Sequence, residues 1–247
     1  MKHLNWRIVI GVGLIAISAI VYFFHFLIFR DAHHIFLYLV GDIAFVFIEV
    51  LLVTLIIDQL LHEREKRSLL FKLNMIIGVF FSEGGSELLR RLSEFAPQVE
   101  RIRQDLLMND RWTKQDFSAI SERIHSYPYK MDSQEGDLES LRDFLKEKKD
   151  FLLRILENPN LFEHEKFTDA LWAVLHLAEE LTCRKSLENL PRPDYVHLAG
   201  DMGRAYQRLI AQWLNYMIHL KEHYPYLFSL AIRTNPFDPK ATPEVTE

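Results

Sequence analysis

The chain has 247 residues, a formal net charge of −5 and a single cysteine, Cys183. One cysteine excludes an internal disulfide, so the composition is compatible with a reducing compartment. The small negative charge, without a clustered basic face, gives no reason to expect nucleic acid as a partner. Charged residues are also placed unevenly, because only three of the 29 basic residues, Lys2, Arg7 and Arg30, lie before residue 62.

Two long apolar runs occupy the first quarter of the chain, at residues 8–29 and 35–61. The first run contains no Asp, Glu, Lys or Arg, and a helix of that length rises about 30 Å, the thickness of the hydrocarbon core. A cleaved signal peptide is the competing interpretation, but the run is too long and no small-x-small cleavage site follows it. Because the loop at 30–34 is short, residues 1–61 are predicted to form a transmembrane hairpin.

Basic residues flank this predicted hairpin on one side. They are Lys2 and Arg7 before the first span, and Arg64, Lys66, Arg67 and Lys72 after the second. Basic residues next to spans favour the cytoplasmic side. The pattern therefore predicts that both termini are cytoplasmic.

The second span carries two carboxylates, Asp42 and Glu49. A charge near the bilayer centre costs roughly 2.5–3.5 kcal/mol on insertion scales, so such groups face protein or water. Because His25 of the first span lies at a similar depth, we expect a contact between His25 and Asp42, within one hairpin or between two. Glu49 is expected to be protonated or to meet another subunit. These groups serve either helix association or ion and proton transfer, and the sequence favours association.

Helical periodicity and capping signals continue through the rest of the chain. Residues 62–83 are predicted to extend the second span as a juxtamembrane connector that the glycine pair at 84–85 breaks. Residues 84–233 are predicted to form an all-α cytoplasmic domain, a helical bundle. Its expected helices cover 86–95, 97–108, 114–125, 137–157, 161–183, 194–222 and 225–232. Residues 234–247 contain three prolines and are predicted to be a disordered tail.

The strongest chemical pattern is a pair of couples at i,i+4 spacing: His176 with Glu180, and His197 with Asp201. If their two helices form an antiparallel hairpin, two imidazoles and two carboxylates meet, a set that can ligate a divalent transition metal. The alternative is a solvated helix face, because polar residues at this spacing are common and arginines nearby can pair with the carboxylates. Cys183 has no sequence context that would make it a nucleophile.

Three stretches carry a resemblance. They are residues 41–58, the Asn-Met-Ile-Ile-Gly-Val-Phe-Phe run at 74–81, and 224–237, which opens with Tyr-Pro-Tyr-Leu-Phe. Together they resemble uncharacterised bacterial membrane proteins with two N-terminal spans and a helical cytoplasmic region, over most of the chain. The resemblance implies a bacterial inner membrane and transfers no catalytic residue, because the group has no assigned activity.

Three functions are compatible with these patterns. The first is a membrane-anchored interaction or signalling module, without cofactor or enzymatic activity, that binds a protein partner or self-associates in the lipid bilayer. The second is a metal-binding helical-bundle enzyme or sensor. The third is a small oligomeric channel, since two spans enclose a pore only when several copies assemble.

Overall fold

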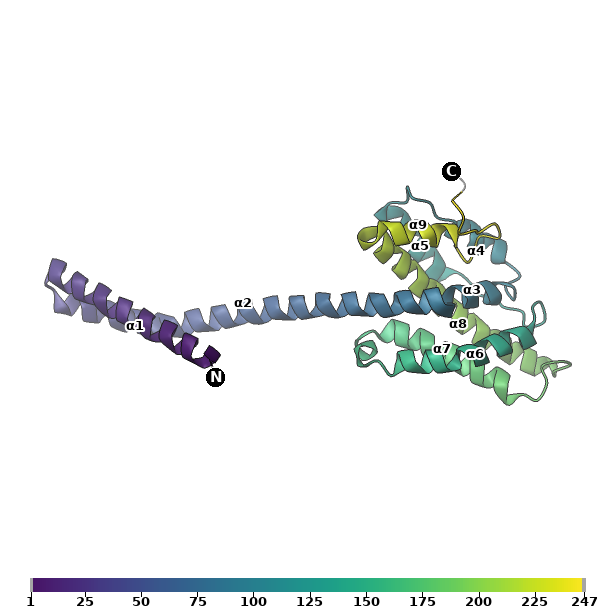
Figure 1. Ribbon diagram of the computed structural model, residues 1–247, viewed down its shortest axis with the longest axis horizontal. Coiled ribbons are helices and arrows are strands. Elements are labelled where there is room, and N and C mark those ends of the chain that lie inside the picture. The colour runs from purple at the N-terminus through teal and green to yellow at the C-terminus, as the bar shows by residue number, and fades with distance from the viewer. Residues whose placement is uncertain (1, 246–247) are drawn as a thin grey trace. The chain divides into compact units, whose positions relative to one another are not determined.

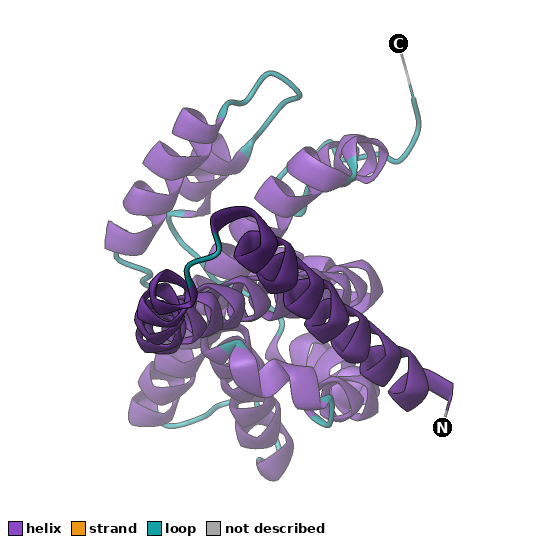
Figure 2. Cartoon of the chain, turned by 90° about the vertical axis from the view of Figure 1, so that its left-hand side faces the viewer, coloured by secondary structure: helices purple, strands orange, loops and turns teal. Residues whose placement is uncertain are grey.

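The computed structural model describes residues 2–245, apart from the side chains of residues 2–5, 7, 162 and 163. The described residues form helices joined by loops and contain no strand (Figure 2). The all-α fold class expected from the sequence is therefore confirmed. The chain divides into two compact units, Met1–Lys66 and Arg67–Glu247.

The first unit consists of α1 (Lys2–Phe29) and the first part of the long helix α2 (Ala32–Phe80). The loop is shorter than expected, because α2 already begins at Ala32. The Asp31 carboxylate accepts a hydrogen bond of 3.1 Å from the backbone N–H of His34, which satisfies a free donor of the first helical turn. Arg30 reverses the chain with a φ of 49°.

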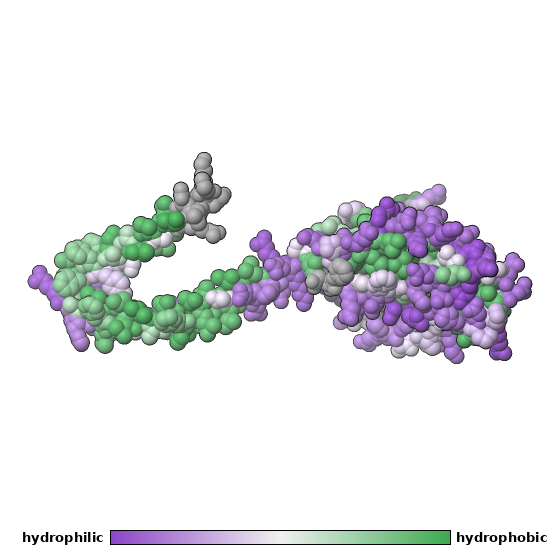
Figure 3. Space-filling view, turned by 90° about the horizontal axis from the view of Figure 1, so that it is seen from below, coloured by the Kyte–Doolittle hydropathy of each residue, from purple (hydrophilic) through white to green (hydrophobic). Residues whose placement is uncertain are grey.

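Apolar side chains cover most of the face of this unit seen in Figure 3, and most of the large apolar residues between Ile8 and Leu61 are exposed. The stretch Ile8–Phe29, and one within Ala32–Ser93, are long and apolar enough to cross a membrane, and neither is buried by protein. A helix that is hydrophobic all round belongs in a protein core or in a bilayer. By length and composition, both helices are candidates for membrane spans.

The second unit begins inside α2. Leu73, Ile77 and Phe80 are buried there at helical spacing, so this part of α2 belongs to the core of the bundle. The expected connector at 62–83 is thus wrong in its extent, since its residues from Arg67 onward lie in the second unit. Apolar residues of this segment that suggested a connector pack into the hydrophobic core of the bundle.

The expected helix break at the glycine pair is also wrong. The chain passes through one π-helical turn, Phe81–Gly85, directly into α3 (Ser86–Ser93). A Cβ added at Gly85 would overlap the ring of Phe80. Glycine is therefore required by close packing at this position, and its lack of a side chain does not end the helix.

The remaining helices lie close to the ranges predicted from periodicity. They are α4 (Val99–Leu106), α5 (Lys114–Ser126), α6 (Leu138–Leu156), α7 (Glu165–Cys183), α8 (Arg192–His223) and α9 (Pro225–Arg233), with a 3₁₀ turn at Pro159–Glu163. α8 is central, since it packs against α3, α5, α7 and α9, and α6 lies beside α7 (Figure 1). Tyr206, Trp213 and Met217 of α8 are fully buried in this core.

The predicted disorder of the tail is wrong for its first residues. Phe237 is 0% exposed and stacks edge to face on Trp213, with ring centroids 5.0 Å apart. The buried Asn235 side chain donates a hydrogen bond of 2.8 Å to the carbonyl of Leu106. These two anchors offset the entropy cost of ordering a proline-rich segment. Residues 246 and 247 lie outside the described residues.

Candidate metal centre

Helices α7 and α8 form an antiparallel hairpin whose register is set by Arg184. Its guanidinium donates two hydrogen bonds to the Asp194 carboxylate, at 2.8 and 2.6 Å, and one of 2.8 Å to Glu180 Oε2. The planar fork of an arginine matches a carboxylate in this two-bond manner. Arg184 therefore ties the last turn of α7 to the first turn of α8, which begins at Arg192, two residues earlier than predicted.

This register brings His176, Glu180, His197 and Asp201 together. Asp201 Oδ2 lies 3.3 Å from His197 Nε2 and 3.5 Å from His176 Nε2. The Glu180 carboxylate lies 3.4 Å from His197 Nε2 and 3.9 Å from His176 Nε2. Imidazoles and carboxylates thus alternate around a small space between the two helices.

The burial of the cluster is one-sided. The Asp201 side chain is only 2% exposed, whereas those of His176 and His197 are 45% and 52% exposed. Asp201 Oδ1 pairs with Arg204 at 3.1 Å, but Oδ2 is buried and accepts no hydrogen bond from the described residues. A buried acceptor without a donor costs about 1–3 kcal/mol. A cation among the four side chains would remove this cost.

The separations themselves discriminate between a hydrogen-bonded and a metal-binding arrangement. Charge-assisted N–H···O bonds are about 2.7–2.9 Å long, shorter than all four Nε2–oxygen distances. Ligand atoms at about 2.0–2.1 Å from a tetrahedral Zn²⁺ are roughly 3.3–3.4 Å apart. The two separations from Asp201 Oδ2, at 3.3 and 3.5 Å, are close to that value. His176, Glu180 and Asp201 each place one possible ligand atom within 4.8 Å of the other two, so these three side chains could hold an ion.

Electrostatics keep Glu180 available as a ligand. The hydrogen bond from Arg184 lowers the pKa of the Glu180 carboxyl below its ordinary value, and the two imidazoles act in the same direction. Arg184 likewise lowers the pKa of Asp194. Metal ligands bind in their deprotonated form, so a carboxylate that stays ionised binds without releasing a proton. Arg184 occupies Oε2 of Glu180, which leaves Oε1 for an ion.

Sequence reasoning did not identify Arg184. It did expect a nearby arginine to pair with Asp201, and Arg204 lies 3.1 Å from Asp201 Oδ1. Arg184 lies in a loop just beyond α7, where helical periodicity gives no information. Its spacing of four residues from Glu180 was the available signal. Its pairing with Asp194 depends on the hairpin and has no local signature.

The polar residues of the first unit are arranged differently from the expectation. The ring of His25 packs on Phe29 and stacks with His34, with centroids 4.7 and 6.2 Å away. No ion pair joins His25 to Asp42 among the described residues. The expected contact, within one hairpin or between two, stays a prediction. Asp42 and Glu49 are both exposed on α2.

Fold and site together define an all-helical protein with two apolar N-terminal helices and a bundle that carries a His/carboxylate cluster. The chain belongs to the MJ1433 family: residues 1–61 match the model described as "MJ1433, N-terminal helical domain", and residues 69–233 match "Uncharacterized protein MJ1433, C-terminal helical domain".

A relative from the archaeon Methanocaldococcus jannaschii carries the description "Uncharacterized protein MJ1433". It is 46% identical over 241 residues, which cover 98% of this chain and 97% of the relative. No solved structure matches the chain. An archaeal relative lends no support to the bacterial source that the resemblance implied.

Proposed function

We propose that this protein is a membrane-anchored helical module whose bundle binds a divalent transition metal between α7 and α8 and thereby acts as a metal-responsive signalling or interaction domain. The observation that carries the proposal is Asp201 Oδ2, a buried carboxylate oxygen without a hydrogen bond that faces two imidazole nitrogens at 3.3 and 3.5 Å. Residues of this chemistry at these separations suit Zn²⁺ or a similar ion.

A sensing role fits this cluster better than catalysis. With His197 as a fourth ligand beside His176, Glu180 and Asp201, the shell would be four-coordinate, whereas catalytic zinc sites keep one position for water or substrate. The half-exposed histidines let an ion enter from solvent, and Arg184 connects the cluster to the turn between the helices. Binding would therefore stiffen the α7–α8 hairpin, the change that a partner can detect.

Elemental analysis of the purified protein tests whether this cluster binds a metal ion. The protein is expressed with a histidine-free tag, and the wild type is compared with His176→Ala/His197→Ala. The matched control, His33→Ala/His62→Ala, removes two exposed imidazoles of α2 that lie outside the cluster. Near-stoichiometric metal in the wild type and control, and none in the cluster variant, is the expected result. Equal metal content in all three proteins would refute the site.

The anchor would consist of α1 and the apolar part of α2 in the cytoplasmic, or inner, membrane, with both termini and the bundle in the cytoplasm. The basic residues after the second apolar run support this orientation. The side chains of Lys2 and Arg7, which support it from the other end, lie outside the described ones.

The single cysteine offers a direct test of this topology. Cys183 is exposed on the bundle, so an impermeant maleimide should label it only after the cells are opened. In a Cys183→Ser background, Ala32→Cys at the turn of the hairpin should be labelled in intact cells. Labelling of Cys183 in intact cells would place the bundle outside and overturn the orientation.

Self-association through α2 completes the proposal. Asp42 and Glu49 form no ion pair with any described residue, and carboxylates within a span usually face protein or water. The α2 helix of a second copy of this chain would supply the protein surface that these carboxylates need, without another gene product. Cross-linking in membranes should trap a homo-oligomer that Asp42→Leu/Glu49→Leu alters, and ion flux in liposomes would distinguish a channel from simple packing. A cross-linking pattern identical in both proteins would argue against this surface.

A further inference from the structure

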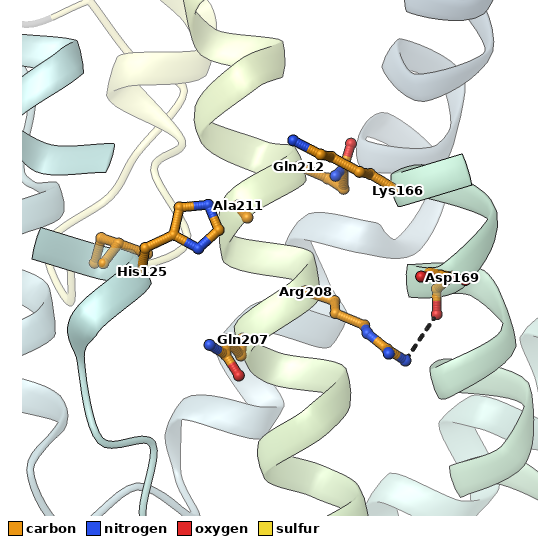
Figure 4. Close-up of a pocket in the computed structure, with 8 residues that line it drawn as sticks. His125, Lys166, Asp169, Gln207, Arg208, Ala211 and Gln212 are labelled. Carbon is orange, nitrogen blue, oxygen red and sulfur yellow. Dashed lines mark hydrogen bonds between the residues drawn. The ribbon is translucent and has the colours of Figure 1, made fainter. Parts of the chain in front are cut away.

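A second polar site lies in the bundle, apart from the metal cluster. It is a cavity of about 270 Å³ between α5, α7 and α8. Figure 4 shows His125 on one side, Lys166 and Asp169 on the other, and Gln207, Arg208 and Gln212 of α8 between them. None of these residues belongs to the cluster around Asp201.

Gln212 is the unusual residue of this cavity. Its side chain is 2% exposed, and its Oε1 atom is buried without a hydrogen-bond partner. Its neighbours on α8, such as Leu209 and Trp213, are buried apolar residues, as expected for the core face of a helix. A buried amide oxygen that no protein group satisfies calls for a donor from elsewhere. A bound molecule with an N–H or O–H group would supply that donor.

The cavity is lined by two cationic side chains, Arg208 and Lys166, and by one carboxylate, Asp169, and no ion pair joins them among the described side chains. Arg208 donates only a long hydrogen bond, 3.3 Å, to the backbone carbonyl of Asp169, and it forms no ion pair with a carboxylate. Lys166 forms no ion pair with any carboxylate whose side chain the structure describes, and it lines the same cavity (Figure 4). The half-buried guanidinium of Arg208 thus presents free donors in the geometry that suits a carboxylate or phosphate.

We propose that this cavity binds a small organic anion that carries an acidic group, carboxylate or phosphate, together with a hydroxyl or amino donor. The acidic group lies against Arg208 and Lys166, and the donor binds Gln212 Oε1. Ile124 and Ala211 supply apolar contact for the remaining atoms. The volume is near the lower end for small-molecule sites, which suits a small metabolite and is too small for a dinucleotide.

Calorimetry on the full-length protein in detergent tests the proposal with four probes. Glycerol 3-phosphate is compared with propyl phosphate, and lactate with propionate, at constant ionic strength balanced with chloride. Each pair differs in its hydroxyl groups, and the two pairs distinguish phosphate from carboxylate. We expect saturable binding of one acid type, with the hydroxylated probe bound roughly tenfold more tightly because it completes a buried hydrogen bond.

Substitutions test which side chain binds the acidic group of the probe and which binds its hydroxyl group. Arg208→Gln should weaken both members of the pair about tenfold or more, whereas Arg192→Gln, an exposed arginine on the same helix, should not. Gln212→Met keeps the size of the side chain and should abolish the preference for the hydroxylated probe while raising the Tm of the ligand-free protein. His176→Ala/His197→Ala should retain anion binding, which separates this site from the metal centre.

Two results would overturn the inference. One is the absence of saturable binding for all four probes in the wild type. The other is binding that Arg192→Gln weakens as much as Arg208→Gln, which marks it as nonspecific attraction to positive charge. Circular dichroism of each variant shows whether a loss of binding merely reflects unfolding.

Discussion

Replacing Asp201 by Asn separates a metal ligand from a structural ion pair. The substitution keeps the shape of the side chain and removes its charge. In the metal-free protein, Asn still offers an oxygen to Arg204, and its amide can donate to a neutral imidazole at the place of the unpartnered Oδ2. Arg204 is 52% exposed and is easily solvated. We therefore expect the metal-free stability to change by about 1 kcal/mol or less.

The metal-bound protein should respond very differently. At a metal concentration 100 times the Kd, binding adds about 2.7 kcal/mol to the free energy of unfolding. For a bundle of this size that corresponds to a rise in Tm of about 5–11 °C. Loss of one ligand that weakens binding about 100-fold leaves roughly 0.4 kcal/mol at the same concentration, a rise of about 1–2 °C.

The assay is thermal unfolding in detergent, followed by far-ultraviolet circular dichroism, with Zn²⁺ and with a chelator. An equal rise in Tm with metal in the wild type and in Asp201→Asn would refute the metal centre. A fall of many degrees in the chelated variant would show that the buried carboxylate serves the fold itself. The expected pattern, little change without metal and a lost response with metal, is specific to a ligand.

Three further predictions concern the bundle. Phe237→Ala should cost about 3–5 kcal/mol, because the ring is fully buried, and denaturant unfolding measures it; an unchanged midpoint would contradict the packed tail. Arg184→Gln should lower Tm at neutral pH and change it little near pH 2. The reason is that Arg184 lowers the pKa values of Glu180 and Asp194 in the folded protein. The two ionised carboxylates therefore stabilise the fold at pH values above the carboxyl pKa of the unfolded chain. This stabilisation is lost as the pH falls through the lowered pKa of the folded state. An equal loss at both pH values would contradict this coupling. Gly85→Ala should destabilise by about 1–3 kcal/mol through overlap with a phenylalanine ring, and a neutral result in the same denaturant assay would contradict the close approach.

The candidate metal centre shows how far local patterns extend. The i,i+4 spacing of its two couples is a property of single helices, and the short connection between those helices predicts their antiparallel arrangement. Which residue becomes buried is not local: Asp201 is enclosed while both imidazoles face water, because the packing of the whole hairpin decides exposure. The cavity around Gln212 has no sequence signature at all, since three separate helices form it.

The sequence by itself determined the positions of the helices and the two apolar runs. These features depend on periodicity and on caps formed within a few residues, such as the capping box of Thr113 and Asp116, which the structure contains. Only the tertiary structure decided that the helix continues through the glycine pair at 84–85 and that the first residues of the tail are packed on the bundle. Gly85 packs against a ring, and Asn235 bonds to Leu106, 129 residues earlier in the chain. Local composition indicated a break and disorder at these positions, but contacts between distant residues outweigh such preferences once a core has formed.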